Sequence, residues 1–167
     1  HNGRVCLSDM DPRQRGLFAA AWNLGLVAAF ARGGLDAVAL GAVTGPQGAI
    51  YRKADHAQPW FDAAKAEVYP AYHVLAGLGA ASGNKRLDAV SSAPSSVAAL
   101  GYLADGGREL WLANLTPEAQ KVKLTGLKGE AEIHRLSDAN FQKIASEPDF
   151  LLDAGERVRK LGAVELG

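Results

Sequence analysis

The sequence predicts an α+β protein in two parts. A helix–strand–helix unit of the kind that closes a parallel α/β array comes first, and an antiparallel β-sandwich follows. Three observations predict this organisation: a charge-free stretch at residues 16–31, a continuous apolar run at residues 35–43, and an alternation of period two after residue 84. Residues 1–84 carry 13 charged side chains and residues 85–167 carry 23, and both parts are nearly neutral. The second part is therefore the more solvated one, and we place the domain boundary at the turn signal of residues 82–85.

The first helix is expected to begin at Asp11-Pro12, with Asp11 as N-cap and Pro12 at the first helical position. It should end near Arg32, where a cation suits the helix end and the following glycines can adopt the left-handed cap. The charge-free stretch has 16 residues, and a membrane-spanning helix needs about 20. A helix that is apolar nearly all round is a buried helix, so we expect protein on its outer side as well as its inner side. Its small residues would permit close backbone approach: Ala19, Ala20, Gly25, Ala28 and Ala29.

The apolar run at residues 35–43 has the composition of a strand covered on both faces, as in parallel sheets. A turn at residues 44–48, a polar loop with aromatic residues to about residue 65, and a second helix over residues 69–81 should follow. One strand cannot make a sheet. We therefore expect the missing strands before His1, in the same polypeptide or in a separate chain.

The second part predicts a series of short strands. A hairpin is expected where residues 97–104 and 110–116 flank Asp105-Gly106-Gly107. Further strands are expected at residues 122–125, 129–136, 158–161 and 164–166. Such spacing is typical of an antiparallel sandwich, whose last strand we expect to be missing.

Composition excludes several classes of function. A net charge of zero provides no field for a nucleic acid or an anionic membrane. The single Cys6 and four dispersed histidines do not form a metal-ligand pattern, and no phosphate-binding glycine motif is present, so no cofactor is expected. Without a visible signal peptide, a cytoplasmic location is favoured, although the natural N-terminus is absent from this sequence.

Three segments and one strand carry a resemblance to a known architecture. They are Asp11-Pro12-Arg13-Gln14-Arg15-Gly16, residues 39–46 (ALGAVTGP), residues 69–75 (YPAYHVL) and the strand Leu110–Thr116 (LWLANLT). The chain resembles the C-terminal end of carbohydrate-active hydrolases built from a (β/α)8 barrel and a β-sandwich, such as the heparanase, β-glucuronidase and β-xylosidase groups. It is similar in particular to bacterial D-apionate lactonase-type proteins. The resemblance implies that residues 1–84 hold helix 7, strand 8 and helix 8 of the barrel, and that residues 85–167 form the sandwich.

The resemblance also implies that the catalytic residues lie upstream of His1. Glycosidases of this architecture place an acid/base Glu, typically in an Asn-Glu pair, after strand 4 and a nucleophile Glu after strand 7. No Asn-Glu pair occurs here, and retaining chemistry needs two carboxylates about 5 Å apart. We therefore expect a non-catalytic fragment of a glycosidase-like or lactonase-like parent, whose sandwich buttresses the barrel. A carbohydrate-binding module and a purely structural or interaction module remain the alternatives.

Barrel active sites gather at the C-terminal ends of the strands. The resemblance therefore implies that the loop after strand 8 supplies a wall facing a sugar or sugar-acid substrate, with Thr44, Gln47, Tyr51, His56 and Trp60 as candidates. Trp60 could stack on a sugar ring, and Gln47 or Arg52 could bind hydroxyls or a carboxylate. The preferred alternative is that Trp60 and Phe61 only anchor the loop.

Other candidates have simpler interpretations. Residues 2–11 could also reach the cleft, but a loop leading to a helix cap is the more ordinary interpretation. His73 is interpreted as a structural histidine and Trp111 as a packing residue. Arg13 and Arg15 are interpreted as partners in an interdomain salt bridge, with binding of a substrate carboxylate as the alternative. The uncharged face of the first helix requires a cover, which we expect to be the missing barrel portion or a second copy of the chain.

Overall fold

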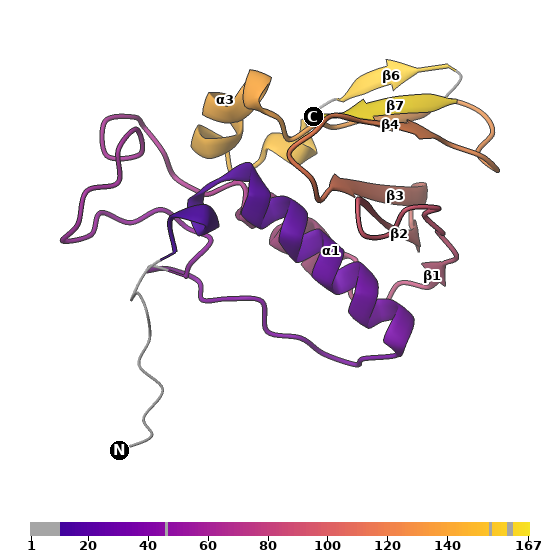
Figure 1. Ribbon diagram of the computed structural model, residues 1–167, viewed down its shortest axis with the longest axis horizontal. Coiled ribbons are helices and arrows are strands. Elements are labelled where there is room, and N and C mark those ends of the chain that lie inside the picture. The colour runs from indigo at the N-terminus through magenta and orange to yellow at the C-terminus, as the bar shows by residue number, and fades with distance from the viewer. Residues whose placement is uncertain (1–10, 46, 154, 160–161) are drawn as a thin grey trace.

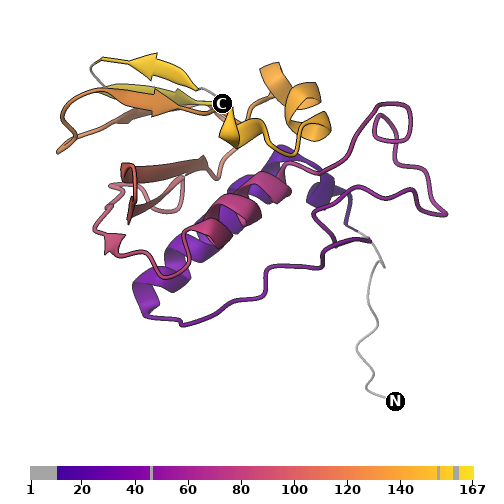
Figure 2. The ribbon, with the colours of Figure 1, turned by 180° about the vertical axis from the view of Figure 1, so that it is seen from behind.

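The computed structural model describes residues 11–45, 47–153, 155–159 and 162–167. Two helices, α1 (Leu17–Gly33) and α2 (Ala71–Ala80), pack against each other and against one face of a three-stranded antiparallel sheet (Figures 1 and 2). The sheet has the order β1 (Arg86–Leu87), β2 (Val97–Ala104) and β3 (Gly107–Asn114). The fold class is therefore α+β, with helices before the sheet as the sequence predicts.

The first helix follows its predicted signals with one change at its start. Asp11 caps a short 3-10 turn, Pro12–Arg15, by accepting a hydrogen bond from the Arg13 backbone N–H at 3.0 Å. The α-helix proper begins at Leu17, one turn later than expected. At the other end, Gly34 has φ 76° and its N–H donates to the carbonyl of Phe30, which confirms the left-handed cap.

The described residues bury only one face of α1. Ala20, Leu24 and Ala28 recur every four residues and face the sheet. Phe18, Trp22 and Phe30 remain 48%, 56% and 37% exposed. The sequence predicts that α1 is buried on all sides, and the described residues do not provide that burial.

The predicted strand at residues 35–43 is not formed. This segment is extended and mostly exposed, with Val43 at 71%. Its one ladder contact with other described residues is an isolated bridge between Ala42 and Gly48. An extended segment needs neighbouring strands to satisfy its backbone groups. Within the described residues no other strand lies beside residues 35–40, so its apolar side chains have nothing to pack on.

The hairpin of β2 and β3 is confirmed. It turns at Asp105-Gly106, and the register pairs Ala104 with Gly107 and Leu100 with Trp111. Because paired residues project to the same side, two alternating sets result. Ala98, Leu100, Trp111 and Ala113 form the side that meets α1 and α2.

Two further antiparallel pairs follow the sheet. Strand β4 (Gln120–Lys123) pairs with β7 (Ala163–Leu166), and β5 (Ala131–Ile133) pairs with β6 (Glu156–Val158). In both ribbon views the β4–β7 pair lies on the side of β3 away from α1 (Figures 1 and 2). The strand expected at residues 158–161 is thus shifted toward its N-terminal side, and residues 160–161 lie outside the described part of the chain.

A short helix that the sequence did not predict, α3 (Phe141–Ser146), bridges the two parts of the molecule, with the short 3-10 turns Asp138–Asn140 before it and Phe150–Leu152 after it. The carbonyl of Ala145 accepts hydrogen bonds from the N–H groups of Glu67 and Val68 at 2.8 and 3.1 Å. The carbonyl of Ile144 is 2.6 Å from Nε2 of His73. Carbonyls of the last helical turn, which lack partners inside the helix, are therefore satisfied by the first part of the chain.

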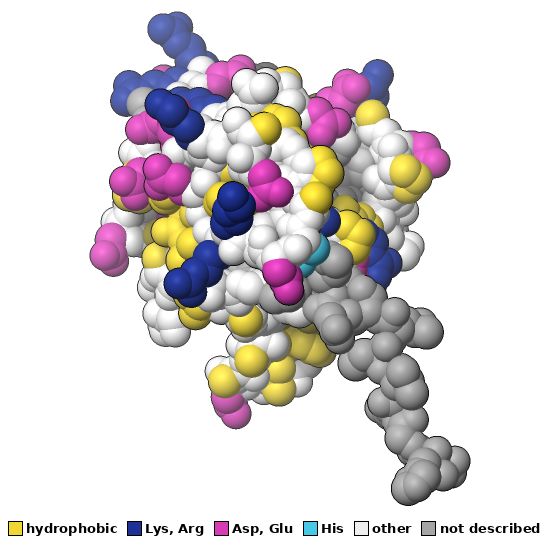
Figure 3. Space-filling view, turned by 90° about the vertical axis from the view of Figure 1, so that its left-hand side faces the viewer, with side chains coloured by type: hydrophobic (Ala, Val, Ile, Leu, Met, Phe, Trp, Pro, Cys, Tyr) yellow, Lys and Arg dark blue, Asp and Glu magenta, His cyan; other side chains and the backbone are white. Residues whose placement is uncertain are grey.

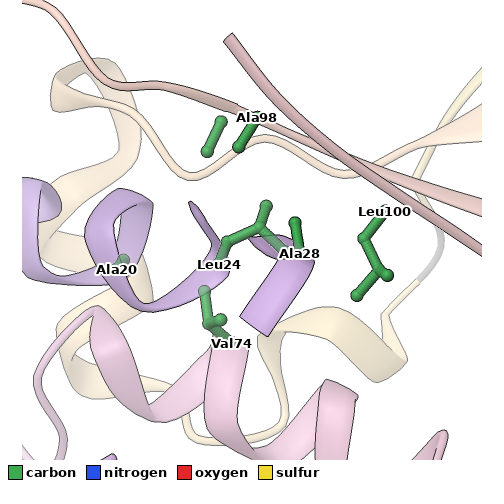
Figure 4. Close-up of a cluster of buried hydrophobic side chains, with 7 residues drawn as sticks. Ala20, Leu24, Ala28, Val74, Ala98 and Leu100 are labelled. Carbon is green, nitrogen blue, oxygen red and sulfur yellow. The ribbon is translucent and has the colours of Figure 1, made fainter. Parts of the chain in front are cut away.

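The core is shared between the two parts. Ala20, Leu24, Ala28 and Val74 from the helices meet Ala98, Leu100 and Ala113 from the sheet (Figure 4). The small residues of α1 permit the close approach that the sequence suggests, since a Cβ on Gly25 would lie 3.1 Å from Leu115. The expected packing of the sandwich on the helices is confirmed, because apolar surface of both is buried in one cluster.

Candidate functional site

The loop between residue 41 and α2 is tied down by backbone hydrogen bonds. Tyr51 N–H donates to the Glu67 carbonyl at 3.0 Å, and Tyr69 N–H donates to the Ala49 carbonyl at 2.8 Å. An isolated antiparallel bridge joins Ile50 to Val68 between these bonds. The long loop therefore leaves and returns at the same place, which sets the position of every candidate residue within it.

Thr44 and Gln47 lie in an exposed turn at the start of this loop. The Gln47 carbonyl accepts a hydrogen bond from the Ala42 N–H at 3.0 Å, and both side chains are open to solvent. Gln14, in the 3-10 turn before α1, anchors this turn, because its side-chain amide donates to the Gly48 carbonyl at 3.2 Å. The side chains of Thr44 and Gln47 are thus accessible, and their backbone is held.

Tyr51 takes part in a hydrogen-bond network inside the loop. Its hydroxyl donates to Oδ1 of Asp62 at 2.9 Å, while the other carboxylate oxygen accepts from the Gln58 N–H at 2.6 Å. Gln58 is 2% exposed, and its side chain accepts from the Tyr69 hydroxyl and donates to the Arg52 carbonyl at 2.8 Å. Every polar group of this buried glutamine is occupied, as burial requires.

The same network shifts two pKa values. The backbone hydrogen bond from Gln58, followed by the hydroxyl of Tyr51, lowers the pKa of Asp62. The hydrogen bond to Asp62 in turn raises the pKa of Tyr51, because ionisation of the phenol would place two negative charges together. At neutral pH Tyr51 is therefore a neutral donor committed to Asp62.

Trp60 belongs to an aromatic cluster between the loop and α3. Its ring centroid lies 4.9 Å from that of Phe61 and 5.0 Å from that of Phe141, both at steep interplanar angles. Tyr51 and Tyr69 pack on Phe61 from other sides. The structure thus brings Tyr51 and Trp60 to one cluster, and Thr44 and Gln47 belong to the turn that precedes it.

Trp60 also has an unusual backbone. Its φ is 64°, and among the described residues other than glycine it alone has a positive φ. A bulky side chain in this region costs about 1–3 kcal/mol and persists only where the surroundings hold it. Here the conformation is held by the hydrogen bonds between Gln58 and Asp62 and by the ring contacts with Phe61 and Phe141.

An open depression lies beside this cluster. It has a volume of about 400 Å³ and is lined by Trp60, Ala63, Ala64, Lys65, Gln142 and Ser146. One wall therefore comes from the loop and the other from α3, two segments about 80 residues apart in the sequence. No sequence pattern predicts that these two segments lie side by side, because α3 was not expected.

The other singled-out residues have local partners. His56 lies 3.4 Å from the carboxylate of Asp55. His73 is 1% exposed and bonded to the Ile144 carbonyl, which confirms its structural role. Arg13 forms a salt bridge of 2.7 Å with Asp11, its own N-cap, so the expected interdomain salt bridge is wrong for this residue. Residues 2–10 and Cys6 lie outside the described part of the chain.

Trp111 is a packing residue, as expected. A Cβ on Gly77 of α2 would lie 2.5 Å from the Trp111 ring, so the ring rests directly on the helix backbone. Its Nε1–H donates to the Tyr102 hydroxyl at 2.9 Å, and that hydroxyl donates to Glu109 at 2.5 Å. The indole ring therefore packs on α2, and its N–H group is hydrogen-bonded.

The described residues contain neither a metal-binding cluster nor a membrane-spanning helix. No group of three or more His, Cys, Asp or Glu side chains among them is placed to hold a metal ion. None of their helices has the length and apolarity that crossing a bilayer requires.

Comparison with known proteins matches both parts of the chain. Residues 1–83 match the family model of the D-apionate lactonase TIM barrel domain, and residues 94–163 match that of the D-apionate lactonase C-terminal immunoglobulin-like domain. The D-apionate lactonase of Brucella anthropi is 30% identical over 121 residues, which is 72% of this chain and 18% of that protein. This chain thus spans less than a fifth of the curated relative. No solved structure matches it. The chain belongs to the D-apionate lactonase family, of which it carries a piece of the TIM barrel domain and the immunoglobulin-like domain.

Proposed function

We propose that this chain is a non-catalytic C-terminal part of a sugar-lactonase-related hydrolase, in which the immunoglobulin-like sandwich buttresses the barrel. The observation that carries the proposal is the core shared by α1, α2, β2 and β3. The bonds from Glu67, Val68 and His73 to the end of α3 support it independently. A sandwich attached at two places restrains the last barrel helices and the loop between them.

In the parent protein, the substrate is a sugar or sugar acid and the catalytic residues lie upstream of His1. Thr44 and Gln47 offer accessible polar groups, and Tyr51 and Trp60 lie in the loop that the sandwich supports. These four residues form part of the substrate-facing wall in this proposal. Glycosidase-like chemistry remains the alternative to lactone hydrolysis for the parent.

Activity assays test the absence of catalysis. The chain alone is incubated with sugar lactones and with aryl glycosides, and the full-length protein serves as the positive control. We expect turnover from the full-length protein only. Turnover by the chain that a point mutation within it abolishes would contradict the proposal.

A substitution in the shared core tests the buttress. Ala113, 6% exposed, faces α1, so Ala113→Glu places an unpaired carboxylate between sheet and helices at a cost of several kcal/mol. In the full-length protein we expect a lower Tm and loss of lactonase activity together. Val90→Glu is the matched control, because Val90 is 90% exposed. Full activity in a protein whose sandwich alone has unfolded would refute the buttress role.

The exposed apolar face of α1 is a surface that a partner of the chain would cover. Phe18 and Trp22 stack at 5.9 Å on this face and require a cover, which we propose is the upstream barrel in the parent and a second copy in the isolated chain. Light scattering should show an oligomer for the chain alone and a monomer for Trp22→Glu. A monomeric wild-type chain would contradict this proposal.

A further inference from the structure

We propose that the depression between the loop and α3 binds a sugar acid, that is, a small polyhydroxylated carboxylate. Trp60 supplies the surface for the carbon skeleton, Lys65 the charge for the carboxylate, and Gln142 with Ser146 the polar groups for hydroxyls. The choice of ligand class rests on the proposed function, since lactone hydrolysis yields an acid of this kind.

The shape suits a ligand of this size. Small-molecule sites start at roughly 300 Å³, and this depression holds about 400 Å³ between two separate elements. Ala63 and Ala64 add only methyl groups to its wall, so they leave space beside the indole. An open site lined by a tryptophan and several polar side chains fits a sugar better than it fits a large apolar molecule.

Trp60 is held in place before any ligand arrives. Phe61 and Phe141 contact the ring at steep angles, and Trp60 still lines the depression. The positive φ of Trp60 stores strain, and such residues concentrate at binding sites. A rigid, half-buried indole loses little entropy on binding, which favours its use as a stacking surface.

The depression offers a ligand both a cationic side chain and neutral hydrogen-bonding groups. The ion pairs formed by the described residues do not include Lys65. The Ser146 hydroxyl donates to the Gln142 carbonyl at 2.8 Å, which leaves its oxygen as an acceptor for a ligand hydroxyl. On the side of the molecule that carries the loop, basic and acidic side chains both occur among neutral ones (Figure 3). Lys65 is thus the group that would discriminate an acid from a neutral polyol.

Binding of two matched probes to the isolated chain tests the proposal. Sodium D-gluconate and the uncharged D-sorbitol are titrated by calorimetry into the wild type, Lys65→Gln and Lys53→Gln. Both lysines are exposed in the same segment, but Lys53 does not line the depression. We expect gluconate to bind more tightly than sorbitol, and Lys65→Gln to weaken gluconate by about 5-fold, as for an exposed ion pair. Sorbitol binding and the Lys53→Gln variant should be unchanged.

A second variant isolates the indole. Trp60→Gly removes the ring while allowing the same positive φ, and we expect it to abolish saturable binding of both probes with the circular dichroism spectrum retained. Absence of saturable gluconate binding to the wild type, equal affinity for both probes, or an unchanged affinity in Lys65→Gln would overturn the proposal. These measurements need no turnover, so a failure here is distinct from a failure of the full-length protein to hydrolyse lactones.

Discussion

Gly77 allows a sharp test of how α2 packs on the sheet. A Cβ at this position would lie 2.5 and 2.6 Å from two atoms of the Trp111 ring, whose position is also fixed by the bond from Nε1 to Tyr102. Gly79 lies in the same helix, and a Cβ there would meet nothing within 4 Å. The pair Gly77→Ala and Gly79→Ala therefore separates steric overlap from helix propensity.

The expected magnitudes follow from these distances. Replacing glycine by alanine inside a helix contributes about 1 kcal/mol of stability, and overpacking a close contact costs about 1–3 kcal/mol. Gly79→Ala should therefore stabilise the protein by up to about 1 kcal/mol. Gly77→Ala should be less stable than Gly79→Ala by about 2 kcal/mol, since the propensity gain is common to both.

Thermal unfolding followed by circular dichroism measures this difference. For a chain of this size, about 2 kcal/mol corresponds to roughly 4–8 °C in Tm. In a Trp111→Phe background, which lacks the two overlapping atoms, the penalty of Gly77→Ala should disappear. Equal stabilisation by the two alanine variants in the wild-type background would refute the packing of Trp111 on α2.

Three further predictions concern single side chains. Trp111→Ala should lower the free energy of unfolding by about 3–5 kcal/mol in a denaturant titration, whereas a stable variant that had only lost glycan affinity would favour a carbohydrate-binding module. Burial lowers the pKa of His73 below its usual 6.5, so stability should fall as pH drops through 6.5 toward the folded pKa, where the unfolded chain binds the proton more readily. His73→Gln should flatten this profile in pH-dependent unfolding, and an unchanged profile would contradict the reasoning. Burial, with the hydrogen bond to Glu109, raises the pKa of Tyr102 to about 12. Stability should therefore fall as pH rises above 10 toward that value. An ultraviolet titration of Tyr102→Phe should lack the tyrosine component near pH 12 that the wild type shows.

Much of the secondary structure could be predicted because its signals are local. The cap at Gly34 needs only a residue that tolerates a positive φ, and the turn at Asp105-Gly106 needs only two residues flanked by strands. The structural role of His73 also followed from its apolar neighbours. For the same reason the alternation in β2 and β3 correctly placed Trp111 on a packed face, since the side-chain period of a strand is two.

The sequence by itself also determined the family resemblance and the presence of two parts. Tertiary structure decided the rest. Residues 35–43 have the composition of a covered strand, but strand formation depends on neighbours, and the described residues supply none beside most of this segment. Helix α3 has six residues and is too short to be stable alone, so it exists because Glu67, Val68 and His73 satisfy its last carbonyls. The depression beside Trp60 depends on that helix, which is why no local pattern in the loop could have located it.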